Sequence, residues 1–209
     1  MREIFNINSN NRIRNQIFRL IFDKKQISKQ EIAAQLNLSL PTVSQYLQSL
    51  KDDGLIDYSG TFESTGGRKA KIIQCVENAF FALGLDITRN HLSLVLINMR
   101  GNICFSNRIK LTFQNNAEYF SAVGVTIDRF IADHQIDCNK VLGVSLTLPA
   151  IIASDRKTVT YATVIDTDAS FYRKIGPYIK FPFKIYNDAN AAAFAEYWVH
   201  NEIETMAYI

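Results

Sequence analysis

An amide and a carboxylate, Asn187 and Asp188, stand at the head of an alanine-rich segment, DANAAAFAEYWVH, whose composition predicts a helix. An aspartate at a helix N-terminus stays ionised because the helix dipole stabilises negative charge there, and its oxygens accept hydrogen bonds from hydroxyl groups. A carboxylate in this position is chemically able to bind the hydroxyl groups of a polyol. The competing interpretation is that Asp188 is only the N-cap of the helix, although capping and ligand binding are compatible.

A second group of polar side chains lies on residues 39–53. Ser39 as a cap and Pro41 in the first turn predict the start of a helix, and Gly54 predicts its end. Apolar residues recur at helical spacing on one face, and the opposite face is polar. Glutamine can pair with adenine, and serine and threonine bind bases or phosphates. The residues that we expect to contact DNA from this helix are Thr42, Ser44, Gln45 and Gln48.

The elements before this helix complete a helix-turn-helix. Residues 11–24 have a helical apolar period, and Ser28 with Glu31 forms a capping box that opens a short second helix. Two short helices separated by about four residues are typical of this DNA-binding motif. The alternative is a three-helix packing unit whose polar face only meets water.

A basic turn follows the three helices. Two strand-like runs, LIDYSG and RKAKIIQC, flank a Gly-Gly pair and predict the wing of a winged helix. We expect Arg68 to enter a minor groove and Lys69 and Lys71 to contact phosphates. The first 80 residues hold 11 Lys and Arg against 8 Asp and Glu, whereas residues 81–209 hold 12 of each, so the net charge of +3 lies entirely in the first 80 residues.

The remaining chain predicts an α/β domain. Residues 79–110 contain three strand-like runs joined by short turns, which predict a β-meander. Helical periods and strand-like runs then alternate, which favours an α/β sheet. The expected helices cover residues 116–134, about 168–179 and 188–200, and the expected strands cover 140–148, 181–187 and 205–209, with a loop opened by Pro149. We therefore place a winged-helix domain at residues 1–75 and an α/β domain at residues 76–209.

Composition excludes several classes of protein. Apolar residues make up 47% of the 209 residues, as in a packed globular chain, and no apolar run approaches the ~18 residues of a membrane helix. The polar N-terminus lacks the apolar core of a signal peptide. Cys75, Cys104 and Cys138 are odd in number and far apart, which argues against a disulfide framework or a zinc cluster. We expect a cytoplasmic protein with reduced thiols and no membrane partner.

Four segments together resemble the ROK family, which joins bacterial sugar kinases to sugar-responsive repressors. They are the wing STGGRKA, the run LGLDI before the meander, GVSLTLPAII in the place of a sugar-contacting loop, and YNDANAAAFAEYW, the most specific match. The resemblance implies the first lobe of an actin-like, ribonuclease H-like sugar-kinase fold behind a winged helix. It also implies that Asn187 and Asp188 face a sugar, and that in the family's kinases the aspartate is the general base.

Two departures from the kinases bear on activity. Family kinases follow their first-strand aspartate with a Gly-Gly-Thr turn that cradles ATP phosphates, but Asp86 is followed here by Ile87, Thr88, Arg89 and Asn90. Side chains would crowd that cradle, so we expect no kinase activity. Family members also continue into a second lobe with a His/Cys zinc site, further sugar contacts and much of the dimer surface. We therefore expect no metal or cofactor in these 209 residues.

Three functions compete at this point. The leading one is a DNA-binding transcriptional regulator of sugar metabolism, most simply a repressor, which binds duplex DNA as a homodimer and responds to a sugar or sugar derivative. The second is an ATP-dependent sugar kinase, supported by Asp188. The third is a winged helix that contacts protein, with the α/β lobe as a scaffold.

Overall fold

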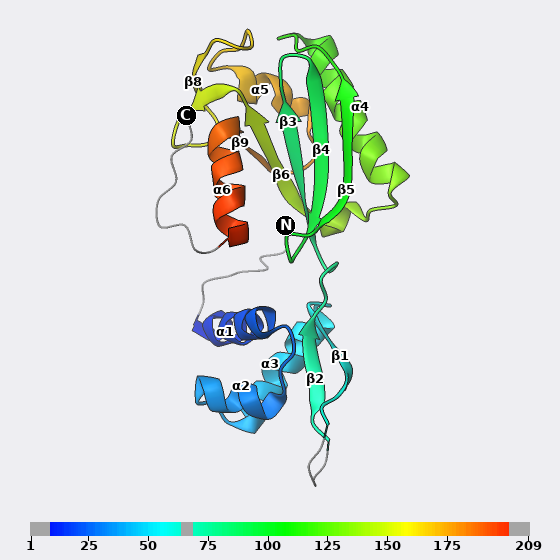
Figure 1. Ribbon diagram of the computed structural model, residues 1–209, viewed down its shortest axis with the longest axis vertical. Coiled ribbons are helices and arrows are strands. Elements are labelled where there is room, and N and C mark those ends of the chain that lie inside the picture. Colours follow the sequence, from blue (N-terminus) through cyan, green and yellow to red (C-terminus); the bar gives the residue numbers. More distant parts are fainter. Residues whose placement is uncertain (1–8, 64–68, 201–209) are drawn as a thin grey trace. The chain divides into compact units, whose positions relative to one another are not determined.

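The computed structural model describes residues 9–63 and 69–200, which form two compact units, Met1–Ala79 and Phe80–Ile209 (Figure 1). Among these described residues, no helix is both long and apolar enough to cross a membrane. Arg68 and the expected strand at residues 205–209 lie outside the described residues.

The first unit is a winged helix. Its elements are α1 (Ser9–Lys24), α2 (Lys29–Leu36), α3 (Leu40–Asp52), β1 (Ile56–Thr61) and β2 (Lys71–Cys75). The two strands pair antiparallel and form the wing. Ile27, between α1 and α2, adds a short bridge to Ile73 that the sequence did not reveal. The helices bury one apolar face each against the strands, and the buried residues include Ile17, Ile21, Ile32, Val43, Leu47, Leu50, Ile56 and Ile73.

Local signals in the sequence set the ends of α2 and α3. Ser28 and Glu31 form the capping box of α2, with the Ser28 N–H donating to Glu31 Oε2 (2.7 Å) and the Glu31 N–H donating to Ser28 Oγ (3.2 Å). Ser39 caps α3, and Gly54 follows it in the left-handed region (φ 70°). These caps act on backbone groups within a few residues, so the starts of both helices and the end of α3 are set by local sequence.

We expect Glu31→Gln to reduce the acid sensitivity of the winged helix. The hydrogen bonds from the Ser28 backbone and hydroxyl lower the pKa of the Glu31 carboxyl. The contribution of this carboxylate to the free energy of unfolding is therefore fully present above the pKa that Glu31 has in the unfolded chain. It is lost as the pH falls through the lower pKa that Glu31 has in the folded state. Glutamine keeps the hydrogen bond to the Ser28 N–H but does not titrate.

The measurement is the guanidinium unfolding midpoint of both proteins from about pH 7 to about pH 3. The parent should lose more stability in acid than the variant, and the two curves should converge. Parallel curves would show that the carboxylate charge contributes nothing to folding.

The second unit is an α/β domain. Its strands are β3 (Phe81–Ile87), β4 (His91–Asn98), β5 (Ile103–Lys110), β6 (Val141–Leu148), β7 (Ala150–Ile152), β8 (Val159–Ala162) and β9 (Phe183–Asn187). Its helices are α4 (Ala117–Asp133), α5 (Phe171–Ile175) and α6 (Asp188–His200), with 3-10 turns η1 (Cys138–Lys140) and η2 (Gly176–Tyr178). The main sheet has the order β5-β4-β3-β6-β9, in which β3, β6 and β9 are parallel and β4 pairs antiparallel with both of its neighbours, β3 and β5.

The core of this unit lies on one face of the main sheet. Alternate residues of β3 and β4 are buried, as the period of a strand requires. They pack against the apolar faces of α4 and α5. Gly124 brings α4 close to η2, since a Cβ there would lie 2.6 Å from the Tyr178 carbonyl oxygen.

Two expectations for this unit were wrong in detail. The helix expected over about 168–179 is only Phe171–Ile175, and Gly176 and Pro177 continue it as a 3-10 turn. The loop expected after Pro149 is instead the β7–β8 hairpin, a two-stranded sheet of its own. Both elements are too short to impose a clear periodicity on the sequence.

Candidate functional site

The outward face of α3 carries the four side chains predicted to meet DNA. Ser44, Gln45 and Gln48 are exposed, and Thr42 is half-buried beside the cap. Ser44 Oγ donates to the Leu40 carbonyl oxygen (2.8 Å), and the Gln48 amide donates to Asp52 Oδ1 (2.7 Å).

Two of these side chains are tied to other parts of the motif. The Thr42 hydroxyl lies 2.8 Å from that of Ser39, and Lys29 Nζ donates to Ser44 Oγ (3.2 Å) from the first turn of α2. Within the described part of the chain, the Gln45 amide has no hydrogen-bond partner. Gln45 is therefore the side chain of this face that can bond a base without breaking a contact within the protein.

Arg14 fixes the position of α3 against α1. Its guanidinium pairs with Asp53, and its Nε donates to Ser49 Oγ (3.3 Å). The Arg14 side chain is only 11% exposed, whereas Arg12 and Arg19 on the same helix are exposed. Arg14 is thus a packing residue, a role that the sequence could not show because its partners lie 35 and 39 residues away.

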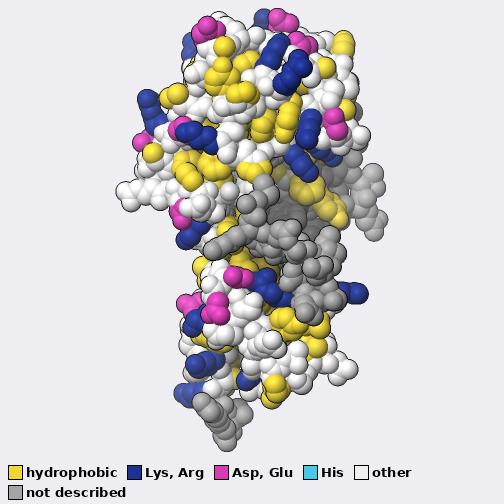
Figure 2. Space-filling view, turned by 180° about the vertical axis from the view of Figure 1, so that it is seen from behind, with side chains coloured by type: hydrophobic (Ala, Val, Ile, Leu, Met, Phe, Trp, Pro, Cys, Tyr) yellow, Lys and Arg dark blue, Asp and Glu magenta, His cyan; other side chains and the backbone are white. Residues whose placement is uncertain are grey.

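The wing is basic where it is described. Lys69 and Lys71 are exposed, and Lys and Arg side chains gather over the β1–β2 hairpin in the lower left of Figure 2. Lys71 Nζ lies 5.2 Å from the centre of the Tyr58 ring, and Lys51 Nζ at the end of α3 lies 5.0 Å from it. A lysine of the wing and a lysine of the last turn of α3 thus lie against the same aromatic ring.

In the second unit, the carboxyl ends of β3, β6 and β9 meet at one edge of the sheet. Asp86, Thr147 and Asn187 stand at or near these ends, and Thr147 Oγ1 donates to Asp86 Oδ1 (2.6 Å). Ligands of open α/β sheets bind at this edge. The hydrogen bond brings Asp86 and Thr147 together, and Asn187, paired in register with Leu148, ends the adjacent strand at the same edge.

Asn187, and not Asp188, caps α6, which leaves Asp188 as the candidate for ligand binding. The capping atom is Asn187 Oδ1, which accepts the Asn190 N–H (2.9 Å), while Asn187 Nδ2 donates to the Ala150 carbonyl oxygen (3.1 Å). Asp188 Oδ1 accepts from Asn187 Nδ2 and from the Ala189 N–H. Among the described residues no hydrogen bond reaches Asp188 Oδ2, so this oxygen is available to a ligand.

The turn after β3 is closed by its own side chains. Thr88 Oγ1 accepts the His91 N–H (3.1 Å), and the Thr88 N–H donates to the His91 carbonyl oxygen (3.0 Å). The carbonyl oxygens of Arg89 and Asn90 accept N–H groups from the chain beyond β5. This tight turn does not form the open, glycine-lined cradle of backbone N–H groups that holds nucleotide phosphates.

An open groove of about 900 Å³ lies beside the turn after β3. Its walls are Thr112–Asn116, after β5, and Ala162–Thr167, after β8, with Arg89 between them. Ala162 pairs with Ala150, the residue whose carbonyl oxygen accepts the Asn187 amide. The sequence did not indicate this groove, because its walls are about 50 residues apart and carry no shared motif.

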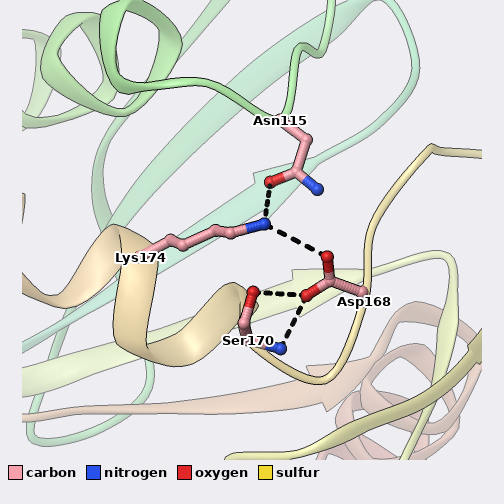
Figure 3. A network of polar contacts seen from close by, with 4 residues as sticks. All are labelled: Asn115, Asp168, Ser170 and Lys174. Atoms are coloured by element: carbon pink, nitrogen blue, oxygen red, sulfur yellow. Dashed lines mark hydrogen bonds and ion pairs between the residues drawn. The ribbon is translucent and has the colours of Figure 1, made fainter.

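A polar network joins Asn115, in one wall of the groove, to Asp168, which directly follows the other wall (Figure 3). Lys174 Nζ donates to Asn115 Oδ1 (3.3 Å) and to Asp168 Oδ2 (3.1 Å). Hydrogen bonds from the Ser170 hydroxyl and backbone N–H, together with Lys174, lower the pKa of Asp168 to about 2. The carboxylate is thus ionised throughout the physiological range, and the bridge does not depend on pH there.

No group of three or more His, Cys, Asp or Glu within residues 9–63 and 69–200 is placed to hold a metal ion. Asp86, Thr147, Asn187 and Asp188 present carboxylate, hydroxyl and amide groups for hydrogen bonding near the sheet edge.

Known proteins share both units of this chain. The xylose repressor of Caldicellulosiruptor bescii is 25% identical over 185 residues, covering 87% of this chain and 46% of that protein. The DNA-binding transcriptional dual regulator NagC of Escherichia coli K12 is 25% identical over 152 residues, covering 73% of this chain and 37% of its own length. The chain thus spans less than half the length of each of these two curated relatives.

A solved structure shares the fold. The crystal structure of a ROK family transcriptional regulator, a homologue of the E. coli MLC protein, matches with a TM-score of 0.65 at 21% identity, covering 88% of this chain and 47% of that one. A winged helix-turn-helix DNA-binding family matches residues 10–57, and the ROK family matches residues 82–209. Since the second match covers more than half of the sequence, this chain belongs to the ROK family.

Proposed function

We propose that this protein is a DNA-binding transcriptional regulator of sugar metabolism whose ROK lobe senses a sugar or sugar derivative. The observation that carries the proposal is the joining of two units in one chain: a winged helix with a free polar face on α3, and a lobe with polar groups gathered at the carboxyl ends of parallel strands. The xylose repressors match across both units.

The DNA contacts that we propose come from α3 and the wing. The N-terminal part of the second helix of a helix-turn-helix meets base edges in the major groove. Gln45 and Gln48 are the candidates for base contacts, Thr42 and Ser44 for bases or phosphates, and Lys69 and Lys71 for phosphates, while Arg68 stays a prediction. A cytoplasmic homodimer would place two copies of α3 on two half-sites of an operator.

The sugar contacts that we propose centre on Asp188. Its unpaired oxygen can accept a hydrogen bond from a hydroxylated ligand, and xylose is the first probe because related repressors carry its name. A ligand that binds one arrangement of the two units better than another would change DNA affinity through that difference alone.

Sugar phosphorylation is the second candidate function, because Asp188 stands in the place of a general base. The closed turn at Thr88–His91 opposes it, since phosphoryl transfer depends on backbone and metal groups that position the phosphates. An assay of ADP release with ATP, magnesium and a sugar panel decides between the two. ADP release above the protein-free rate would show that the protein is a kinase and would contradict the proposed regulator.

The experiment that tests the regulator is DNA binding as a function of salt. Genomic footprinting would first supply a duplex, and the logarithm of its binding constant should then fall linearly with the logarithm of salt concentration, by about 0.9 for each phosphate contacted. Xylose and related sugars should shift the constant. Absence of salt-dependent binding would favour a winged helix used for protein contact.

A further inference from the structure

The wing holds an aromatic ring with two lysines against it. Tyr58 lies on β1, Lys51 in the last turn of α3 and Lys71 at the start of β2, and the two ammonium groups lie 5.0 and 5.2 Å from the centre of the ring. Both distances are within the range of cation–π attraction. Three separate elements of the winged helix therefore converge on one charged cluster.

Lysines that lie against an aromatic ring have less conformational freedom than ordinary surface lysines. A lysine side chain is flexible, and binding usually requires it to lose that freedom. The Tyr58 ring is half-buried and anchored in the hairpin, so it restricts both side chains before any partner arrives. Asp57 pairs with Lys51, its Oδ1 lying 3.9 Å from Lys51 Nζ, and the two side chains are 61% and 46% exposed. A pair with such exposure binds weakly and leaves the ammonium free to exchange partners.

The position of the cluster points to its ligand. Lys51 follows Ser44 by seven residues, which is two helical turns, so both lie on the same flank of α3 and about 10 Å apart along its axis. Lys29 donates to Ser44 at the other end of this flank. A row of cations beside the face that carries Gln45 matches the course of a phosphate backbone beside a groove.

We propose that Lys51 and Lys71 form a phosphate-binding pair for duplex DNA, and that Tyr58 is the positioning residue that holds them. The proposal rests on the proposed DNA binding and deepens it. It adds Lys51 and Tyr58 to the interface, and it gives Lys71 a partner. The pair contacts the backbone and not the bases, so it contributes affinity and salt dependence but no sequence preference.

The test measures the salt dependence of DNA binding for Lys51→Ala and Lys71→Ala in the full chain. Each variant should reduce the slope by about 1 and weaken binding equally on all duplexes. Lys140→Ala, an exposed lysine of the second unit, is the matched control for loss of a charge and should keep the slope of the parent.

Variants of Tyr58 separate positioning from folding. Tyr58→Phe keeps the ring and should bind like the parent, whereas Tyr58→Leu should weaken binding a few-fold. In the Tyr58→Leu background, the loss caused by Lys51→Ala should be smaller than in the parent, because the lysine is no longer held. A purely structural tyrosine would lower the unfolding midpoint and leave the Lys51→Ala effect unchanged.

The outcomes distinguish this inference from the proposed function. If the parent binds DNA with a steep salt slope while both lysine variants keep that slope, the pair is not a phosphate site and the DNA-binding function stands. If the parent shows no salt-dependent binding, both the function and the pair are overturned.

Discussion

Replacing Gln45 with alanine is expected to remove discrimination at one base pair of the operator, by about 1–3 kcal/mol. A glutamine favours adenine because its amide N–H donates to N7 of that base and its amide oxygen accepts from the N6 amino group, and alanine removes both bonds without affecting the helix core. Gln45 is exposed, and its amide has no partner among the described residues. Binding to sequences that already differ at this base pair should change little.

The neighbours of Gln45 explain why the largest effect is expected there. Gln48 donates its amide to Asp52, and the Ser44 hydroxyl donates to the Leu40 carbonyl oxygen. Each of these groups would have to exchange an existing hydrogen bond for one to DNA, which leaves a smaller net gain. Gln45 makes no such exchange.

Competition binding against duplexes that vary each base pair in turn measures the effect. Gln16→Ala is the matched control, because Gln16 is also an exposed glutamine but lies on α1. It should reproduce the preference of the parent at every position. An unchanged preference in the Gln45 variant would move the base-reading surface away from the first turns of α3.

Caps and periodicity in the sequence predicted much of the winged helix. Ser28, Glu31, Ser39 and Gly54 act on backbone groups within a few residues, so their effect on helix ends is visible in the sequence itself. Arg14 shows the limit of such reasoning. Its partners on α3 and just after it are adjacent only once α1 packs there, and a basic residue on a helix surface carries no mark of that contact.

The candidate ligand site was also only partly predictable from the sequence. The Asn187–Asp188 motif was evident from residue types alone, but the choice of capping atom depends on how α6 begins and was resolved only by the hydrogen bonds of Asn187. The groove between Thr112–Asn116 and Ala162–Thr167 depends on the β7–β8 hairpin, whose strands of three and four residues are too short to show a pattern. Sites formed by tertiary contacts between unrelated loops leave no local signal in a sequence.

Replacing Asp188 with asparagine is expected to raise the sugar concentration needed for a response about 10-fold or more, while DNA binding without sugar stays the same. A hydrogen bond from a hydroxyl to an ionised carboxylate is worth about 1.5–3 kcal/mol, and the amide removes the charge that strengthens it. Folding should be preserved, because the cap of α6 is Asn187 Oδ1 and the amide oxygen of an asparagine at position 188 can still accept the Ala189 N–H.

The measurement is the sugar concentration that half-shifts the DNA binding constant, with the unfolding midpoint recorded in parallel. Asp133→Asn, the same exchange at an exposed position near the end of α4, is the matched control and should respond like the parent. If the Asp188 variant responded at the parent's sugar concentration, the carboxylate would not contact the ligand. If it lost DNA binding without sugar, Asp188 would serve the fold or the coupling between the units. Only a loss of sugar response with DNA binding intact places Asp188 at the sensor, because only the ligand distinguishes the charged from the neutral side chain.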